Sequence, residues 1–137
     1  MTIIIDRFML EPGITNSVKL TVTEQLTAMA AGSGSLRVFG TPFMIALIEQ
    51  TAFKSVQPFL DEGQGTVGTL VNVEHLAPTP VGMEVECRTK LEEVDGRRLV
   101  FSAEVFDKCG LVGKGTHQRF IVGEEKFQTK ADAKAAQ

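Results

Sequence analysis

Two ionisable side chains stand where the surrounding sequence calls for apolar ones, and together they could carry acid–base chemistry. Glu49 ends the apolar run of residues 43–48, and its neighbours one helical turn away are Ile45 and Phe53. A carboxylate in that company is costly to ionise unless another group pairs with it. His75 shares a strand face with several valines, and an imidazole near a carboxylate can divide with it the roles of base and orienting group.

Thr41 and Gly68 could complete such a site. We expect Thr41 to cap a helix, with Pro42 at the first helical position, so that its hydroxyl lies at the pocket end of that helix. The first helical amides, together with an amide near Gly68, could stabilise an oxyanion. Gly68 also interrupts a valine-rich strand, which indicates close approach of a ligand or another backbone. In the alternative interpretation, Thr41 is a plain cap, and Glu49 and His75 have structural partners.

His117 and Arg119 lie on one face of the last expected strand. The pattern alone favours a structural role for both, either in the sheet or at a dimer interface. Glu49, His75 and His117 could supply metal ligands, but their spacing matches no metal motif, so we expect no metal. The sequence also has no GxSxG, P-loop or GxGxxG motif.

One long helix, residues 38–59, should carry Thr41 and Glu49. It is apolar on nearly every side, which is typical of a buried helix. A single polar stripe is formed by Gln50, Lys54 and Gln57. A short helical pattern at residues 23–31 and a Gly/Ser loop at residues 32–35 precede the long helix. That loop is either a lid over a pocket or a plain connector.

The rest of the chain has the two-residue period of strands. Strands are expected at residues 18–23, 66–77, 81–91, around 99–105, and 111–122. In the second of them, the predicted common face holds Val67, Thr69, Val71, Val73 and His75. Asp95-Gly96 predicts a tight hairpin. The order predicts an α+β fold, in which a curved antiparallel sheet of about five strands wraps one central helix, and the free sheet edge favours pairing with a second copy.

The composition bounds the remaining possibilities. The chain has 137 residues, of which 43% are hydrophobic, so one domain with a packed core is expected. A net charge of −3 argues against a nucleic-acid partner. No stretch reaches the roughly 20 apolar residues that span a bilayer, and no signal peptide is evident, so we expect a cytoplasmic protein with reduced cysteines and no membrane partner. We divide it into an extension (1–17), the main domain (18–127) and a flexible tail (128–137).

Several stretches resemble the hot-dog-fold acyl-CoA thioesterases, and most closely the fluoroacetyl-CoA thioesterase group. They are residues 38–50 (VFGTPFMIALIEQ), 58–69 (PFLDEGQGTVGT), 71–85 (VNVEHLAPTPVGMEV), 94–107 (VDGRRLVFSAEVFD) and 113–122 (GKGTHQRFIV). The resemblance implies a hot-dog fold and a dimer with active sites at its interface. It places the family's catalytic residues on Thr41, Glu49 and His75. It also places the glycine that holds the thioester carbonyl on Gly68, and the arginine of the GTHxR stretch on Arg119.

The resemblance therefore implies an enzyme that hydrolyses a short acyl-CoA to the free acid and CoA, as a homodimer or a tetramer and without a cofactor beyond the CoA of its substrate. Glu49 would attack the thioester carbonyl or activate water, and His75 would move the proton. Two other functions stay open: a hot-dog hydratase or dehydratase acting on enoyl or hydroxyacyl thioesters, and a non-catalytic acyl-CoA-binding module.

The loop before the long helix departs from the family pattern. The fluoroacetyl-specific enzyme has bulky Phe residues there, whereas residues 32–35 are only Gly and Ser. Leu36 and Phe39 are the nearest bulky side chains, so we expect these two to contact the acyl group. The nature of that group stays open among short chains, fluoroacetyl-like ones included.

Overall fold

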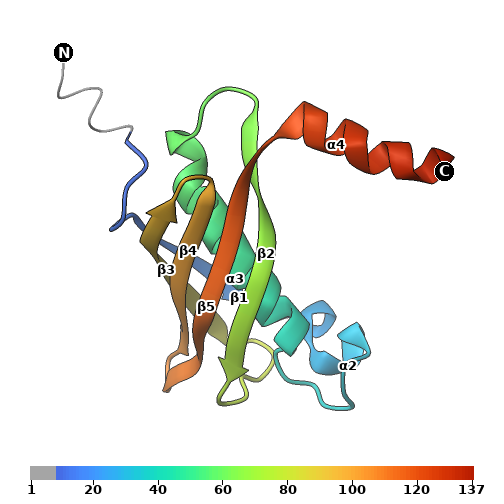
Figure 1. Cartoon of the computed structure of the whole chain (residues 1–137). Helices are drawn as coiled ribbons and strands as arrows, with labels where there is room; N and C mark the ends of the chain where they lie inside the picture. The colour runs from blue at the N-terminus through green and yellow to red at the C-terminus, as the bar shows by residue number, and fades with distance from the viewer. Residues whose placement is uncertain (1–8) are drawn as a thin grey trace.

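Five antiparallel strands and one long helix form the core of the structure, a computed structural model that describes residues 9–137 (Figure 1). The elements in chain order are β1 (Thr15–Thr21), η1 (Glu24–Leu26), α2 (Ala28–Ala31), α3 (Thr41–Val56), η2 (Gln57–Phe59), β2 (Gln64–His75), β3 (Glu84–Asp95), β4 (Arg98–Asp107), β5 (Gly110–Gly123), α4 (Glu124–Ala133) and η3 (Lys134–Ala136). The predicted α+β architecture is therefore confirmed.

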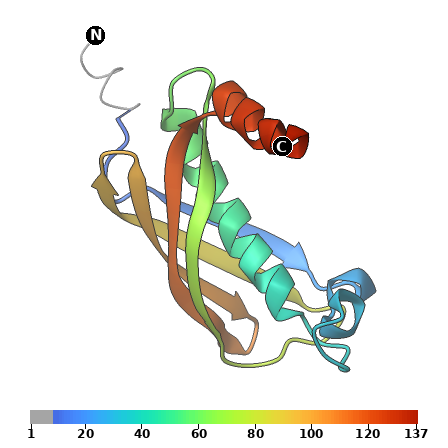
Figure 2. The same ribbon diagram turned by 45° about the vertical axis from the view of Figure 1, so that its right-hand side comes forward.

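The sheet has the strand order β1-β3-β4-β5-β2, so β1 and β2 are its two edges. Its central hairpin turns at Gly96, whose φ of 61° suits the left-handed turn position. All five strands contact α3, because the sheet curves around that helix (Figure 2). The apolar residues of β3 and β4 that alternate with polar ones point toward α3, as their two-residue period predicted.

Helix α3 is shorter than predicted, and its first residue has a different role. Gly40 is the N-cap, Thr41 is the first helical residue and Pro42 the second, so the prediction that Thr41 caps the helix is wrong. The chain before Gly40 is extended, because Val38 and Phe39 make isolated β-bridges. The α-helix ends at Val56, because Pro58 has no N–H to donate to the carbonyl four residues back.

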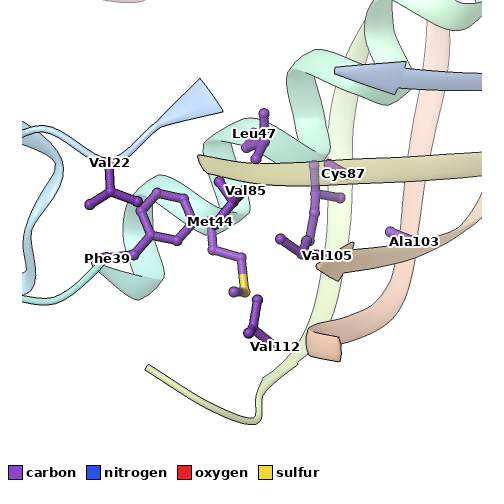
Figure 3. Close-up of a cluster of buried hydrophobic side chains, with 10 residues drawn as sticks. Val22, Phe39, Met44, Leu47, Val85, Cys87, Ala103, Val105 and Val112 are labelled. Atoms are coloured by element: carbon purple, nitrogen blue, oxygen red, sulfur yellow. The ribbon is translucent and has the colours of Figure 1, made fainter. Parts of the chain in front are cut away.

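One side of α3 packs into the sheet and the other is open. Figure 3 shows Met44 and Leu47 of α3 meeting side chains from several strands, and Phe39 closes the end of this cluster. On the open side, Glu49 is partly exposed and Phe53 is 37% exposed. The prediction of a helix buried on nearly every side is therefore wrong for a single chain.

A β-bulge lies in the middle of β2. Gly68 pairs with Arg119 and Leu70 pairs with Gln118, so Thr69 is an extra residue between them. Before the bulge, Thr66 and Gly68 face α3 and Arg119. The prediction that Val67 and Thr69 point to the same side as His75 is therefore wrong. Beyond the bulge the inward residues are those predicted: Val71 pairs with the buried His117, Val73 packs on the core, and His75 reaches the start of α3.

The two ends of the chain differ from the predicted division. Strand β1 begins at Thr15, inside the predicted extension, and residues 1–8 of that extension lie outside the described residues. Residues predicted to form a tail belong to α4, which crosses the predicted boundary at residue 127 and projects past β2 (Figure 1). Among residues 9–137, no helix is long and apolar enough to cross a membrane.

The two cysteines should differ sharply in reactivity. Cys87 is buried beneath α3, and burial raises the pKa of its thiol to about 11, whereas Cys109 is exposed in the β4–β5 turn. Because the thiolate is the reactive form, we expect a thiol reagent at pH 8 to modify one cysteine per native chain and two after unfolding. Intact-mass measurement counts the adducts, and Cys109→Ser is the control. Rapid modification of Cys87 in the folded protein would contradict the burial of this side chain.

Candidate active site

Thr41 and His75 form a direct contact at the start of α3. The distance from Thr41 Oγ1 to His75 Nδ1 is 2.7 Å. Thr41 makes no side-chain capping bond, since Gly40 occupies the cap, so its hydroxyl is free for the imidazole. A hydroxyl within hydrogen-bond reach of a ring nitrogen is the arrangement in which histidine can accept the proton of an attacking oxygen.

His75 is suited to act as a base. Burial lowers its pKa and outweighs the backbone of Ala77, which raises it, so the ring is mostly neutral near pH 7. Phe39 packs edge-on against the imidazole with ring centroids 6.4 Å apart. The other nitrogen, Nε2, is buried and has no hydrogen-bond partner among residues 9–137. His75 therefore has a fixed position and an unused ring nitrogen.

A shallow pocket of about 320 Å³ opens over this pair. Thr41 and His75 line it together with residues of α2, of the loop before α3 and of the segment after β2, namely Ala28, Ser33, Val38, Phe39, Leu76, Ala77 and Pro78. Phe39 belongs to the lining of the pocket and packs against His75, but it has no exposed surface of its own, so its contact with the acyl group stays a prediction. Leu36 is 66% exposed in the loop before α3 and stays a candidate contact.

The helix offers fewer oxyanion donors than predicted. The amides of Phe43 and Met44 both donate to the Gly40 carbonyl, at 3.0 Å each, and Pro42 has no N–H. The amide of Thr41 is the remaining donor of the first turn.

Glu49 has a different partner from the one predicted. Its Oε2 lies 3.4 Å from Nη1 of Arg119, and its side chain is 41% exposed. Arg119, only 6% exposed, sits beside it on β5. Gly68 leaves room for this pair, because a Cβ at that position would lie 2.8 Å from Glu49 Oε2. The absence of a side chain at Gly68 therefore keeps the carboxylate accessible.

The candidate residues thus form two groups within one chain. At about 1.5 Å of rise per residue, Thr41 and Glu49 lie roughly 12 Å apart along α3. The first group joins Thr41 to His75, and the second joins Glu49 to Arg119, Gly68 and His117. The predicted contact between Glu49 and the Thr41–His75 pair does not form inside a single chain. Among the described residues, no group of three His, Cys, Asp or Glu side chains could hold a metal ion.

Residue-by-residue reading of the sequence missed Thr66. Its hydroxyl and its carbonyl both accept hydrogen bonds from Arg119, at 2.8 and 2.9 Å. A threonine next to a valine looks like an ordinary strand residue, and only the register of β2 against β5 brings it to Arg119. A buried arginine needs acceptors for its N–H groups, and a search for them near Arg119 would have been the available signal.

Comparison with known proteins relates the chain to one group. Residues 22–125 match the family model described as "FlK: Fluoroacetyl-CoA-specific thioesterase". The fluoroacetyl-CoA thioesterase of Streptantibioticus cattleyicolor is 38% identical over 97 residues, which are 71% of this chain and 70% of that protein.

Solved structures agree with the sequence comparison. A mutant of the fluoroacetyl-CoA thioesterase FlK in complex with acetyl-CoA is 30% identical, with a TM-score of 0.86 over 91% of this chain and 98% of that one. Another FlK mutant was crystallised with fluoroacetate and CoA. A hot-dog-like protein from Thermanaerovibrio acidaminovorans, 22% identical, has a TM-score of 0.84 over 94% of this chain and 95% of its own, which confirms the hot-dog fold.

His117 should make stability depend on pH. The pKa of His117 is lowered, chiefly by burial and further by the charge of Arg119. The hydrogen bond to the Leu70 backbone and the charge of Glu49 raise it, but by less. Below about pH 6.5 the histidine binds a proton in the unfolded state but stays neutral in the folded state until the pH is lower. The free energy of unfolding therefore keeps its full value above that pH and decreases as the pH falls below it. Urea unfolding at pH 7.5 and 5.5 measures the loss, which should shrink in His117→Phe; an equal loss in this variant would refute the assignment. Burial also lowers the pKa of His75, so His75→Gln measures the separate contribution of that histidine to the loss.

Proposed function

Because this chain belongs to the family of fluoroacetyl-CoA-specific thioesterases, whose members are thioester hydrolases, we propose that it hydrolyses a short acyl-CoA to the free acid and CoA. The observation that carries this proposal is the 2.7 Å contact between Thr41 Oγ1 and His75 Nδ1 beneath an open pocket. The related FlK structures with acetyl-CoA and with fluoroacetate and CoA support an acyl-CoA ligand of this size.

In the reaction, an oxygen nucleophile binds the thioester carbonyl carbon, the C–S bond breaks, and the CoA sulfur leaves and gains a proton. In one route Glu49 activates a water, which attacks and gives the free acid directly. In the other two routes the Glu49 carboxylate or the Thr41 hydroxyl attacks and expels the CoA sulfur, and water then hydrolyses the resulting anhydride or ester to the free acid. We propose that His75 accepts the proton of the attacking water or hydroxyl and delivers it to the sulfur; where Glu49 attacks, the sulfur leaves as thiolate and takes its proton from solvent, and His75 accepts the proton of the water in the second step. The amide of Thr41 and the amides near Gly68, which lie in different groups within one chain, would hold the oxyanion together where the two groups meet, with Arg119 near Gly68.

We further propose that the working site is shared between two copies of the chain. Strand β2 is a free sheet edge with Leu70 and Val71 exposed on it. Antiparallel pairing of β2 with its copy would bring the His75 end of one strand toward the middle of the other, where Glu49 lies. The partner's Glu49 would then complete the Thr41–His75 pair, and the contact would cover the open side of α3. A tetramer of such dimers and a cytoplasmic location stay predictions.

The direct test measures CoA release from a panel of short acyl-CoA esters with a thiol reagent. Thr41→Ala, Glu49→Gln and His75→Ala should each lower kcat by roughly 100-fold or more, since each removes a proton-transfer or attacking group. Gln50→Ala, on the exposed face next to Glu49, is the matched control and should keep wild-type activity. The proposal fails if His75→Ala and Glu49→Gln both release CoA at the wild-type rate. Crotonyl-CoA hydration without CoA release would indicate the hydratase instead, and tight binding without turnover would indicate the binding module.

Mixing two inactive variants tests the shared site. In a mixed dimer of Thr41→Ala and Glu49→Gln chains, one site combines both substitutions and the other combines two wild-type groups. Random exchange of subunits should therefore restore about a quarter of wild-type activity. Unmixed samples of each variant, treated identically, are the controls. No recovery after exchange, with mixed dimers verified by native mass spectrometry, would mean that Thr41 and Glu49 act from the same chain.

A further inference from the structure

We propose that Thr66 and His117 are positioning residues that act on Glu49 through Arg119. This inference rests on the proposed function, in which Glu49 takes part in the reaction. It assigns a role to two side chains that do not contact the Thr41–His75 pair and that a purely structural view would leave within the sheet.

Thr66 fixes one edge of the Arg119 guanidinium. Nε donates to Thr66 Oγ1 at 2.8 Å, and Nη2 donates to the Thr66 carbonyl at 2.9 Å. Two acceptors on one residue hold two N–H groups of a planar fork, so the plane of the guanidinium cannot rotate without breaking both bonds. Thr66 is 8% exposed and Arg119 is 6% exposed, so water does not readily replace these bonds.

His117 holds the opposite edge and must be neutral to do so. Its Nδ1 lies 2.8 Å from the Leu70 carbonyl, which can only accept, so Nδ1 carries the proton. Its Nε2 lies 3.1 Å from Nη1 of Arg119, which can only donate, so Nε2 is the acceptor. The ring is fully buried and stacks on Phe101 with centroids 6.1 Å apart. His117 therefore orients Arg119 without neutralising its charge.

The remaining polar partner of the guanidinium is Glu49, and the ring of Phe53 lies beside the guanidinium with its centroid 5.9 Å from Cζ of Arg119. Glu49 is the only carboxylate paired with Arg119 in the described part of the chain, and the 3.4 Å contact is longer than an ordinary hydrogen bond. With two neutral partners fixing the cation, its positive charge points at a carboxylate that is held loosely enough to turn toward a substrate. Release of either neutral partner would let the guanidinium rotate, and Glu49 would lose its alignment.

The test compares Thr66→Val with Thr66→Ser. Valine keeps the shape of threonine but removes the hydroxyl, whereas serine keeps the hydroxyl. We expect Thr66→Val to lower kcat for CoA release by roughly 10-fold, as fits the loss of a hydrogen bond to a charged group, with KM within about twofold. Thr66→Ser should stay near wild type. Thr89→Val is the matched control, since Thr89 is a buried strand threonine like Thr66, but its hydroxyl has no hydrogen-bond partner within residues 9–137.

A second readout needs no turnover. The Arg119 Nε–H signal in ¹⁵N NMR should exchange slowly with water in wild type and Thr66→Ser, and at least 10-fold faster in Thr66→Val. Equal kcat values for the two Thr66 variants, or equal exchange, would overturn the inference. If the wild-type protein releases no CoA, the proposed function fails, and the exchange measurement alone then decides whether Thr66 positions Arg119. His117→Phe, which keeps a ring against Phe101, should also accelerate exchange, and unchanged exchange there would overturn the role of His117.

Discussion

The one-residue bulge at Thr69 is the constraint on which the candidate site depends. Side chains of a strand alternate between its two faces, so Thr66 and His75, nine positions apart, would point to opposite faces of a regular strand. The extra residue reverses the alternation between Gly68 and Leu70. As a result Thr66 meets Arg119 and His75 meets Thr41, both on the side of the sheet that carries α3.

Hydrophobic periodicity was enough to predict the architecture. The alternation in β3 and β4, the Asp95-Gly96 turn and the long apolar helix correctly gave an antiparallel sheet around one helix, because burial of an apolar face dominates the arrangement of such elements. The bulge could not be predicted in this way, since an unpaired residue is defined by the register with β5 and Thr69 has ordinary strand chemistry. The face predicted for Val67 was therefore wrong, while that of His75 was right.

The candidate site was predicted in part for similar reasons. The residue types and the family resemblance together predicted Thr41 and His75 as site residues, and the structure brings them into contact. The predicted N-cap, Thr41, was one residue too late, since the structure has Gly40 at that position. Glycine and threonine are both common N-cap residues, so the sequence alone does not decide between them. The partner of Glu49 depends on contacts between residues 70 positions apart, and no local pattern encodes such a distance. Phe39 was predicted to contact the acyl group because its side chain is bulky, and the structure places it in the pocket lining beside His75 but leaves it no exposed surface.

The bulge also has a genetic consequence. An in-frame deletion of a single codon within residues 69–74 would leave Thr41, Glu49, Thr66, Gly68, His75 and Arg119 all present, yet the strand would lose the residue that reverses its faces. Such a gene would still encode every residue with a proposed chemical role, while its product could no longer direct Thr66 and His75 to the same side. The number of residues between Thr66 and His75 thus matters as much for the site as the identities of these two residues. A relative with one residue fewer between them would need a different site.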